Sequence, residues 1–123
     1  MLEHVNFTAT DPDALAALMC RLFGWKVRWA GASIHGGRSV HVGSDASYLA
    51  IFGPKAAPAE GSDTYTHKNG LNHIGIVVDD LDAVEARVKA EGFTPNNHAD
   101  YEPGRRFYFD GPDGVEFEVV SYT

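Results

Sequence analysis

The stretch GLNHIGIVVDDLDAVEARVKAEGF, residues 70–93, contains the pattern that decides the fold. It places a histidine, His73, at the head of an apolar run, and apolar residues at helical spacing follow that run. Asp79 and Asp80 precede the helical segment and Gly92 ends it, as expected for a helix with a polar N-cap and a left-handed C-terminal residue. The stretch therefore predicts a strand that begins at a histidine and leads directly into a helix.

The same pattern opens the chain, in MLEHVNFTATDPDALAALMCRLFGW, residues 1–25. When His4 is aligned with His73, an aspartate follows seven residues later in each copy, and an apolar residue follows eleven residues later. Each copy also ends in a strand-like run, SYLAIFG at 47–53 and VEFEVVS at 115–121. This internal repeat predicts that one strand–helix–strands unit occurs twice in the chain.

The repeat predicts an α+β fold of two tandem βαβββ modules, and we expect these modules to form a cupped mixed β-sheet. We expect a single domain, with module 1 at about 1–53, a linker at about 54–69 and module 2 at about 70–123. Asp11, Pro12 and Gly24 are placed to begin and end the first helix. The strands expected after the two helices are WKVRWAG, RSVHVGS and SYLAIFG in the first copy, and FTPNN (93–97), RRFYFDG and VEFEVVS in the second.

Composition excludes several classes of partner. The 123 residues carry a net charge of −7, and no cluster of lysine or arginine exceeds two residues, so neither nucleic acid nor an anionic membrane surface is expected to bind. No run approaches the roughly 20 apolar residues that a membrane span requires. A single cysteine excludes an internal disulfide, and together with the absence of a secretion signal it predicts a cytoplasmic protein.

Strand alternation sorts the predicted strands into two faces. The apolar face, which must receive the helices, contains Val40, Val42, Leu49, Ile51, Ile74, Ile76, Phe107, Phe109, Phe117 and Val119. The opposite, open face contains His4, His41, Tyr48, Phe52, His73, Arg106, Tyr108, Glu116 and Glu118. Imidazole and carboxylate are the usual ligands of a first-row divalent metal, so the open face is the candidate site.

The duplicated βαβββ pattern, the histidine that opens each copy and the ending FYFDGPDGVEFE, residues 107–118, resemble the vicinal oxygen chelate superfamily. That superfamily includes glyoxalase I, extradiol ring-cleaving dioxygenases, fosfomycin-resistance transferases, methylmalonyl-CoA epimerases and bleomycin-binding proteins. The resemblance covers essentially the whole chain. It implies four ligand slots, which fall on His4, Ala50, His73 and Glu118.

Ala50 is the informative departure from that pattern, because alanine cannot bind a metal. Two histidines and one glutamate remain as the implied metal ligands: His4, His73 and Glu118. Glu116 shares the face with Glu118, but the spacing in the family favours Glu118. The resemblance implies a divalent ion, with Fe²⁺ or Mn²⁺ favoured and Zn²⁺ or Ni²⁺ as further options.

The ligand set is most like that of a small extradiol-type dioxygenase acting on a small-molecule substrate. Two alternatives stay open: a glutathione- or thiol-dependent lyase or transferase, of glyoxalase or fosfomycin-resistance type, and a metal-free protein that sequesters a ligand. The resemblance also implies a homodimer, because small members of the family usually pair.

Further residues of the open face and the linker receive candidate roles. Tyr108 and His67 are the candidate catalytic residues, and Arg106, His41, Tyr48 and Phe52 are candidate substrate-binding residues. Each also has an ordinary structural interpretation. A lining aromatic would explain the tyrosine, an ion pair would explain the arginine, and an exposed loop would explain His67.

Overall fold

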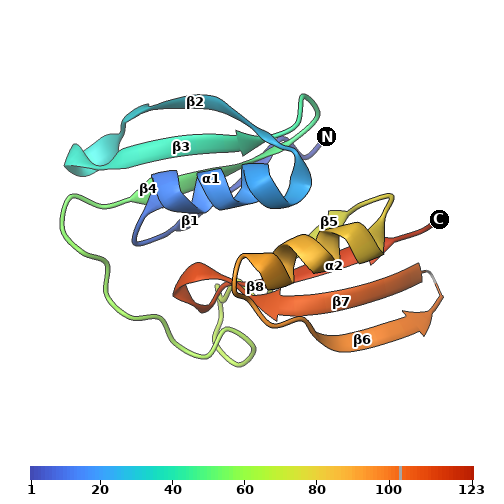
Figure 1. The fold of residues 1–123 in the computed structure, drawn as a ribbon. Coiled ribbons are helices and arrows are strands. Elements are labelled where there is room, and N and C mark those ends of the chain that lie inside the picture. Colours follow the sequence, from blue (N-terminus) through green and yellow to red (C-terminus); the bar gives the residue numbers. More distant parts are fainter. Residues whose placement is uncertain (103) are drawn as a thin grey trace. The chain divides into compact units, whose positions relative to one another are not determined.

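The computed structural model describes residues 1–102 and 104–123, and the chain divides into two compact units (Figure 1). Met1–Glu60 is called module 1 below, and Gly61–Thr123 is called module 2. Each unit contains one α-helix and four strands in the order βαβββ. The predicted α+β class and the duplicated pattern are therefore confirmed.

Module 1 forms a four-stranded mixed sheet in the order β1-β4-β3-β2. Strands β1 and β4 are parallel, and the other two pairs are antiparallel. Helix α1 packs against β3 and β4. The elements are β1 (His4–Thr8), α1 (Pro12–Phe23), β2 (Lys26–Ala32), a short 3₁₀ turn η1 (Ile34–Gly36), β3 (Arg38–Gly43) and β4 (Tyr48–Gly53).

Module 2 repeats this topology in a second sheet, in the order β5-β8-β7-β6. Here β5 and β8 are parallel, and α2 packs against β7 and β8. The elements are β5 (Ile74–Val77), α2 (Leu81–Ala90), β6 (Asn96–Tyr101), β7 (Gly104–Asp110), η2 (Pro112–Gly114) and β8 (Glu116–Ser121).

The helix boundaries follow the predicted capping residues. The Asp11 carboxylate accepts a hydrogen bond from the backbone N–H of Ala14 at 3.0 Å, and Pro12 occupies the first helical position. At the other end of α1, Gly24 has a φ of 69°, which costs glycine nothing. Asp80 caps α2 through the N–H of Ala83 in the same way. These local rules explain why a helix follows the first strand in both modules.

The alternation predicted for the strands is confirmed by burial. The residues on the helix side that are fully buried include Val40, Val42, Ile51, Phe107, Phe109, Phe117 and Val119. Burying each such side chain stabilises the fold by about 1.5–3 kcal/mol before the cost of ordering the chain is counted. The intervening residues lie on the sheet face away from the helix, and the candidate functional side chains are among them.

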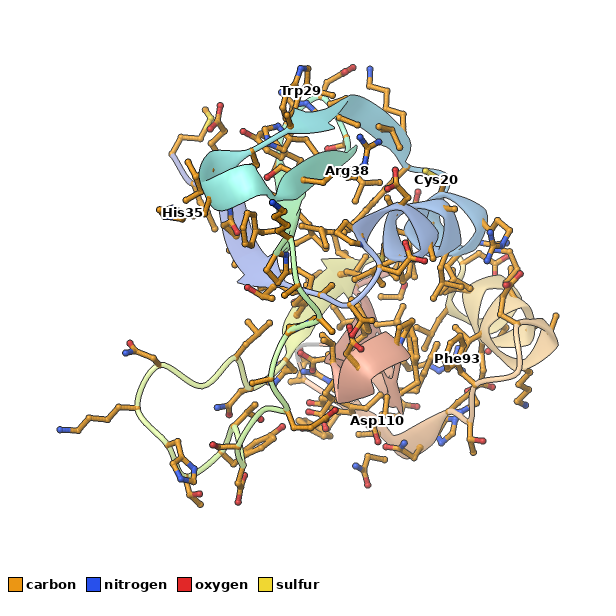
Figure 2. All side chains as sticks on the ribbon, turned by 90° about the vertical axis from the view of Figure 1, so that its left-hand side faces the viewer. Cys20, Trp29, His35, Arg38, Phe93 and Asp110 are labelled. Atoms are coloured by element: carbon orange, nitrogen blue, oxygen red, sulfur yellow. The ribbon has the colours of Figure 1, made fainter. Side chains whose placement is uncertain are left out.

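The strand predicted at 93–97 is wrong in its position. Strand β6 instead runs over Asn96–Tyr101, because Pro95 has no N–H to donate to a ladder. Phe93, labelled in Figure 2, packs its ring 6.0 Å from that of Phe109. His98 therefore lies within a strand, where its Nε2 contacts a carboxylate oxygen of Glu85 on α2.

No helix in the described part of the chain has the length and apolarity needed to cross a membrane.

Candidate functional site

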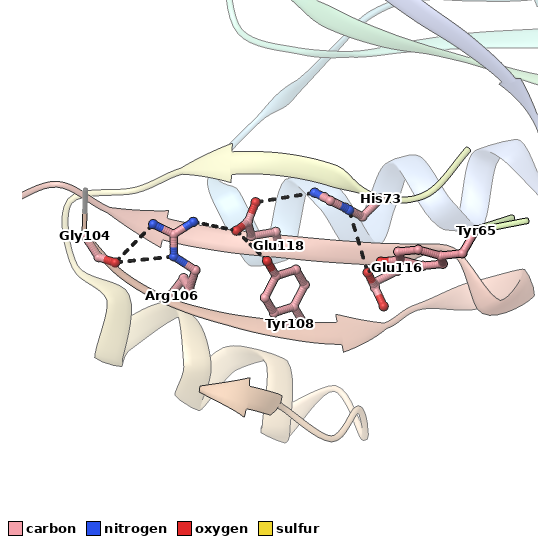
Figure 3. A network of polar contacts seen from close by, with 7 residues as sticks. All are labelled: Tyr65, His73, Gly104, Arg106, Tyr108, Glu116 and Glu118. Atoms are coloured by element: carbon pink, nitrogen blue, oxygen red, sulfur yellow. Dashed lines mark hydrogen bonds and ion pairs between the residues drawn. The ribbon is translucent and has the colours of Figure 1, made fainter. Parts of the chain in front are cut away.

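The open face of module 2 carries a polar network centred on Glu118 (Figure 3). Tyr108 on β7 lies directly opposite Glu118 on β8 and donates its hydroxyl to Oε2 at 2.8 Å. Arg106 donates Nη1–H to the same oxygen at 2.9 Å. Both donors bind one carboxylate oxygen, so the other oxygen, Oε1, is left to face His73.

His73 lies between two carboxylates, just before the first residue of β5. Its Nε2 is 3.5 Å from Oε1 of Glu118, and its Nδ1 is 3.8 Å from Oε1 of Glu116. The rings of His73 and Tyr108 make an edge-to-face contact, with their centroids 5.8 Å apart. The imidazole is 34% exposed, whereas Glu118 is only 13% exposed. The histidine is therefore the part of this pair that solvent reaches more readily.

Tyr65 joins this network from the segment that precedes β5. Its hydroxyl donates a short hydrogen bond to Oε1 of Glu116, the same oxygen that faces His73. That hydrogen bond, with a smaller contribution from partial desolvation, raises the pKa of Tyr65 to about 12. The phenol therefore keeps its proton throughout the physiological range and acts as a donor to Glu116.

Arg106 is held on several sides. Besides Glu118, its Nε and Nη2 lie 3.4 and 3.3 Å from the carbonyl oxygen of Gly104, and its guanidinium carbon lies 5.0 Å from the ring centroid of Tyr101. Its side chain is 12% exposed. The structure thus places Arg106 against Glu118, where it fixes the carboxylate. The hydrogen bond from Tyr108 to Glu118 similarly raises the pKa of Tyr108, so this phenol also stays protonated.

The open face of module 1 places a carboxylate and a tyrosine beside His4. Nδ1 of His4 lies 2.8 Å from Oε1 of Glu3, and the hydroxyl of Tyr48 donates to that same oxygen at 3.2 Å. These bonds, that of His4 first, lower the pKa of the Glu3 carboxyl. The rings of His4 and Tyr48 are stacked with centroids 4.9 Å apart. Because Nδ1 of His4 contacts Glu3, Nε2 is the nitrogen that is left to bind a ligand.

His4 belongs to a row of rings, which we call the aromatic cluster: His4, Trp29, His41 and Tyr48. The ring of His41 stacks on Tyr48 at 4.7 Å and lies 5.1 Å from Trp29 (labelled in Figure 2). Arg28 sits above the Tyr48 ring, with its guanidinium carbon 4.4 Å from the centroid. Burial, followed by the electrostatic influence of the neighbouring His4 and Arg28 side chains, lowers the pKa of His41. His41 is therefore neutral at pH 7 and able to accept a proton.

The strand registers show which residues correspond in the two modules. Ala50 pairs with Asn6 on one side and with His41 on the other. Glu118 pairs with Gly75 and Tyr108 in the corresponding way. The position that carries a carboxylate in module 2 thus carries a buried methyl group in module 1, and the position of Tyr108 is taken by His41.

The remaining predicted residues lie apart from these networks. Phe52 is on β4, where its ring lies across Gly37; a Cβ at Gly37 would come within 2.6 Å of it. His67 lies in the segment before β5, with Nδ1 2.8 Å from the carbonyl oxygen of Asp63. The structure therefore brings together His73, Arg106, Tyr108 and Glu118 in module 2, and His4, His41 and Tyr48 in module 1.

Glu3 and Tyr65 take part in these networks but were not predicted from the sequence, and the same holds for Arg28 and Tyr101. Glu3 could have been noticed as the neighbour of His4, but adjacent residues in a strand point to opposite faces, so alternation argued against it. Tyr65 lies in a segment without periodicity, and no pattern links it to Glu116. A contact between a loop and a strand is visible only in the folded chain.

Among the described residues, no group of three histidine, cysteine or acidic side chains is arranged to hold a metal ion. The predicted ligand set is divided, with His4 in module 1 and His73 and Glu118 in module 2. Two atoms bound to one first-row metal at about 2.0–2.2 Å lie roughly 3–3.5 Å apart. The distance of 3.5 Å between His73 Nε2 and Glu118 Oε1 fits two ligands of one ion. Each histidine also directs Nδ1 at a carboxylate, as metal-binding histidines usually do.

A family model described as the "Glyoxalase/Bleomycin resistance protein/Dioxygenase superfamily" matches residues 1–119. A search of curated proteins found no match.

Solved structures show the same fold over nearly the whole chain. A glyoxylase/bleomycin resistance protein/dioxygenase domain from Frankia sp. EAN1pec has a TM-score of 0.83 and 18% identity, with 98% of this chain and 96% of that chain covered. The fosfomycin resistance protein FosX from Mesorhizobium loti has a TM-score of 0.70 and 21% identity, with coverages of 98% and 90%. TnmS3, an antibiotic binding protein from Streptomyces sp. CB03234, has a TM-score of 0.73 and 17% identity, with coverages of 100% and 96%.

Proposed function

Because the chain belongs to the glyoxalase/bleomycin resistance protein/dioxygenase superfamily, whose members commonly use divalent metals, we propose that it is a metal-dependent enzyme. The proposed ligands are His4, His73 and Glu118. This set of two histidines and one carboxylate leaves positions open for substrate, and it is typical of non-haem Fe(II) oxygenases. The proposed activity is that of a small extradiol-type dioxygenase, with Fe²⁺ or Mn²⁺ as the ion.

One observation carries the proposal: the pairing of His73 with Glu118. Arg106 and Tyr108 hold Oε2 of the carboxylate at 2.9 and 2.8 Å, and Oε1 is presented to Nε2 of His73 at 3.5 Å. An ion between these two atoms would find both ligands already oriented. A network that served only stability would gain more from a direct hydrogen bond between the histidine and the carboxylate.

The chain's own residues suit a planar substrate with two adjacent oxygens. A bound divalent ion would act as a Lewis acid toward those oxygens. The aromatic cluster offers a flat surface beside His4 on which a ring can stack. His41, neutral at pH 7, is placed in that cluster to accept a proton from a substrate hydroxyl. A catechol-like diol combines these features.

Metal binding tests the proposal directly. Calorimetric titration of the chelator-treated protein with Mn²⁺, and anaerobically with Fe²⁺, should give one site per chain. His73→Ala and His4→Ala should each weaken binding at least a hundredfold, since each removes a ligand. His35→Asn is the matched control, because His35 lies in η1 with a φ of 56°, which asparagine tolerates. Ring cleavage of catechols should then depend on the added ion.

Metal binding that is absent, or unchanged in both ligand variants, would end this proposal. One further candidate function then stands, that of a metal-free ligand-binding protein, which the aromatic cluster favours. A binding protein would still take up a planar aromatic ligand in the presence of chelator, and Trp29→Ala would weaken that uptake. A thiol-dependent activity would instead appear as turnover that requires added glutathione.

A further inference from the structure

We propose that Glu116 and Tyr65 are positioning residues for His73. Glu116 accepts the Nδ1 proton of the imidazole, and Tyr65 holds Glu116 in place, so the lone pair of His73 lies on Nε2, the nitrogen that faces Glu118. Glu3 and Tyr48 do the same for His4. This inference rests on the proposed metal site and adds the residues that select which ring nitrogen binds the ion.

The first support is that the same three-group arrangement occurs in both modules. Oε1 of Glu3 lies within hydrogen-bond distance of Nδ1 of His4, at 2.8 Å, and accepts a hydrogen bond from the hydroxyl of Tyr48 at 3.2 Å. In each module, one carboxylate oxygen therefore lies between a tyrosine hydroxyl and a histidine Nδ1.

In module 2, Oε1 of Glu116 is that oxygen. It accepts a hydrogen bond from the hydroxyl of Tyr65 and lies 3.8 Å from Nδ1 of His73 (Figure 3). The carboxylate–imidazole contact is longer here than in module 1, and it is of ion-pair rather than hydrogen-bond length.

The second support is that the two arrangements are built from different positions of the repeat. In module 1 the carboxylate precedes the histidine, and the tyrosine is the register partner of His4 on β4. In module 2 an asparagine precedes the histidine, and the adjacent position on β8 carries Glu116. The tyrosine comes from a loop. Simple duplication would have kept like residues at like positions, so the shared geometry points to a shared requirement.

The loop that carries Tyr65 is fixed by its own hydrogen bonds. The N–H of Tyr65 donates to the side chain of Asp63 at 2.9 Å, and the side chain of Asn72 donates to the carbonyl oxygen of Thr64 at 2.9 Å. Gly70 lets the loop close, because a Cβ there would lie 2.3 Å from that same carbonyl oxygen. A defined turn therefore positions the hydroxyl of Tyr65 beside Glu116.

The chemistry explains why such a pair is useful. A neutral imidazole carries its single proton on one nitrogen, and the hydrogen bond at that nitrogen decides which one is free to bind a metal. A carboxylate on Nδ1 selects the Nε2 lone pair and also makes the ring a stronger ligand. A tyrosine that donates a hydrogen bond to the carboxylate holds the carboxylate oxygen in a position that faces the imidazole ring.

Nuclear magnetic resonance of the ¹⁵N-labelled, chelator-treated protein reads the tautomer without any metal. The measurement is made in a Glu118→Ala background, which removes the competing acceptor 3.5 Å from Nε2. At about pH 8.5, where an ordinary histidine is neutral, His73 should then carry its proton on Nδ1. Glu116→Ala should move that proton to Nε2, whereas Glu116→Gln, whose carbonyl can still accept, should keep it on Nδ1. Tyr65→Phe, in an exposed loop, should give a mixture of both forms.

Metal affinity gives the second readout. Glu116→Ala should raise the dissociation constant for Mn²⁺ about tenfold to a hundredfold, and Tyr65→Phe should raise it by less. Tyr122→Phe is the matched control and should leave it unchanged, because Tyr122 is an exposed tyrosine at the other end of module 2.

An Nε2–H tautomer in the Glu118→Ala protein, or a tautomer that does not respond to Glu116→Ala in that background, would overturn the inference even if the unmutated protein binds metal. Absence of metal binding in the unmutated protein would instead refute the proposed function, while the tautomer measurement would still decide the role of Glu116. Should Glu116→Ala fail to fold, Tyr65→Phe decides the matter through the same spectra.

Discussion

Two neighbouring arginines allow the polar network of module 2 to be tested quantitatively. Arg106 pairs with Glu118 at 2.9 Å, and Arg105 pairs with Asp82 at 3.0 Å. The first pair is 12% and 13% exposed, whereas the second is 51% and 77% exposed. The two substitutions Arg106→Met and Arg105→Met remove the same charge from adjacent positions and keep most of the aliphatic stem.

The expected costs differ because of burial. An exposed ion pair contributes less than about 1 kcal/mol, so Arg105→Met should lower the free energy of unfolding by no more than that. A hydrogen bond to a charged group that is shielded from water contributes about 1.5–3 kcal/mol. Arg106→Met should therefore cost about 2 kcal/mol, since Glu118 would keep only the hydroxyl of Tyr108 as a donor on Oε2.

Urea unfolding followed by circular dichroism gives both values. A double-mutant cycle with Glu118→Gln isolates the pairwise term, which should be about 1 kcal/mol or more. Equal costs for the two arginine variants, or a coupling energy near zero, would show that Arg106 does not fix Glu118. The reasoning about how this carboxylate is oriented would then be wrong.

Three further predictions follow from single contacts. Phenolate absorbance should show that Tyr65 ionises near pH 12 rather than 10, and Glu116→Ala should bring it back toward 10. Because its pKa is raised in the folded state, its stabilising contribution is present below pH 10 and is lost as the pH rises toward 12. Ring-proton titration should give His41 a pKa below 6.5; because the folded state disfavours its charged form, stability should fall as the pH drops below 6.5. Asp11→Ala should cost about 1 kcal/mol in urea unfolding through loss of the α1 cap, while Asp11→Asn should cost much less.

Much of the fold could be predicted because it depends on local rules. Asp11, Pro12 and Gly24 bound α1 by the chemistry of helix ends, and alternation in the strands places His41, Tyr108 and Glu118 on the open face. The repeat then supplies the topology, since two copies of one pattern must fold alike.

The contacts between those residues could not be predicted in the same way. Alternation places Arg106 on the open face, but a long side chain there could reach solvent, substrate or Glu118, and only packing decides among them. The apolar Phe93 predicts a strand that starts too early, because Pro95 delays the ladder until Asn96. Tyr65 reaches Glu116 from a loop, and loop conformation has no sequence period.

Each sheet is built only from strands of its own module, so the first sheet can form before the second module has been synthesised. All four strands of the first sheet lie before the end of β4 at Gly53. Gly61–Thr123 is made afterwards, which takes roughly 3–13 s at a translation rate of about 5–20 residues per second. A hairpin forms in about 1–10 μs. The first sheet therefore has time to assemble on the ribosome while the strands of the second are still being synthesised.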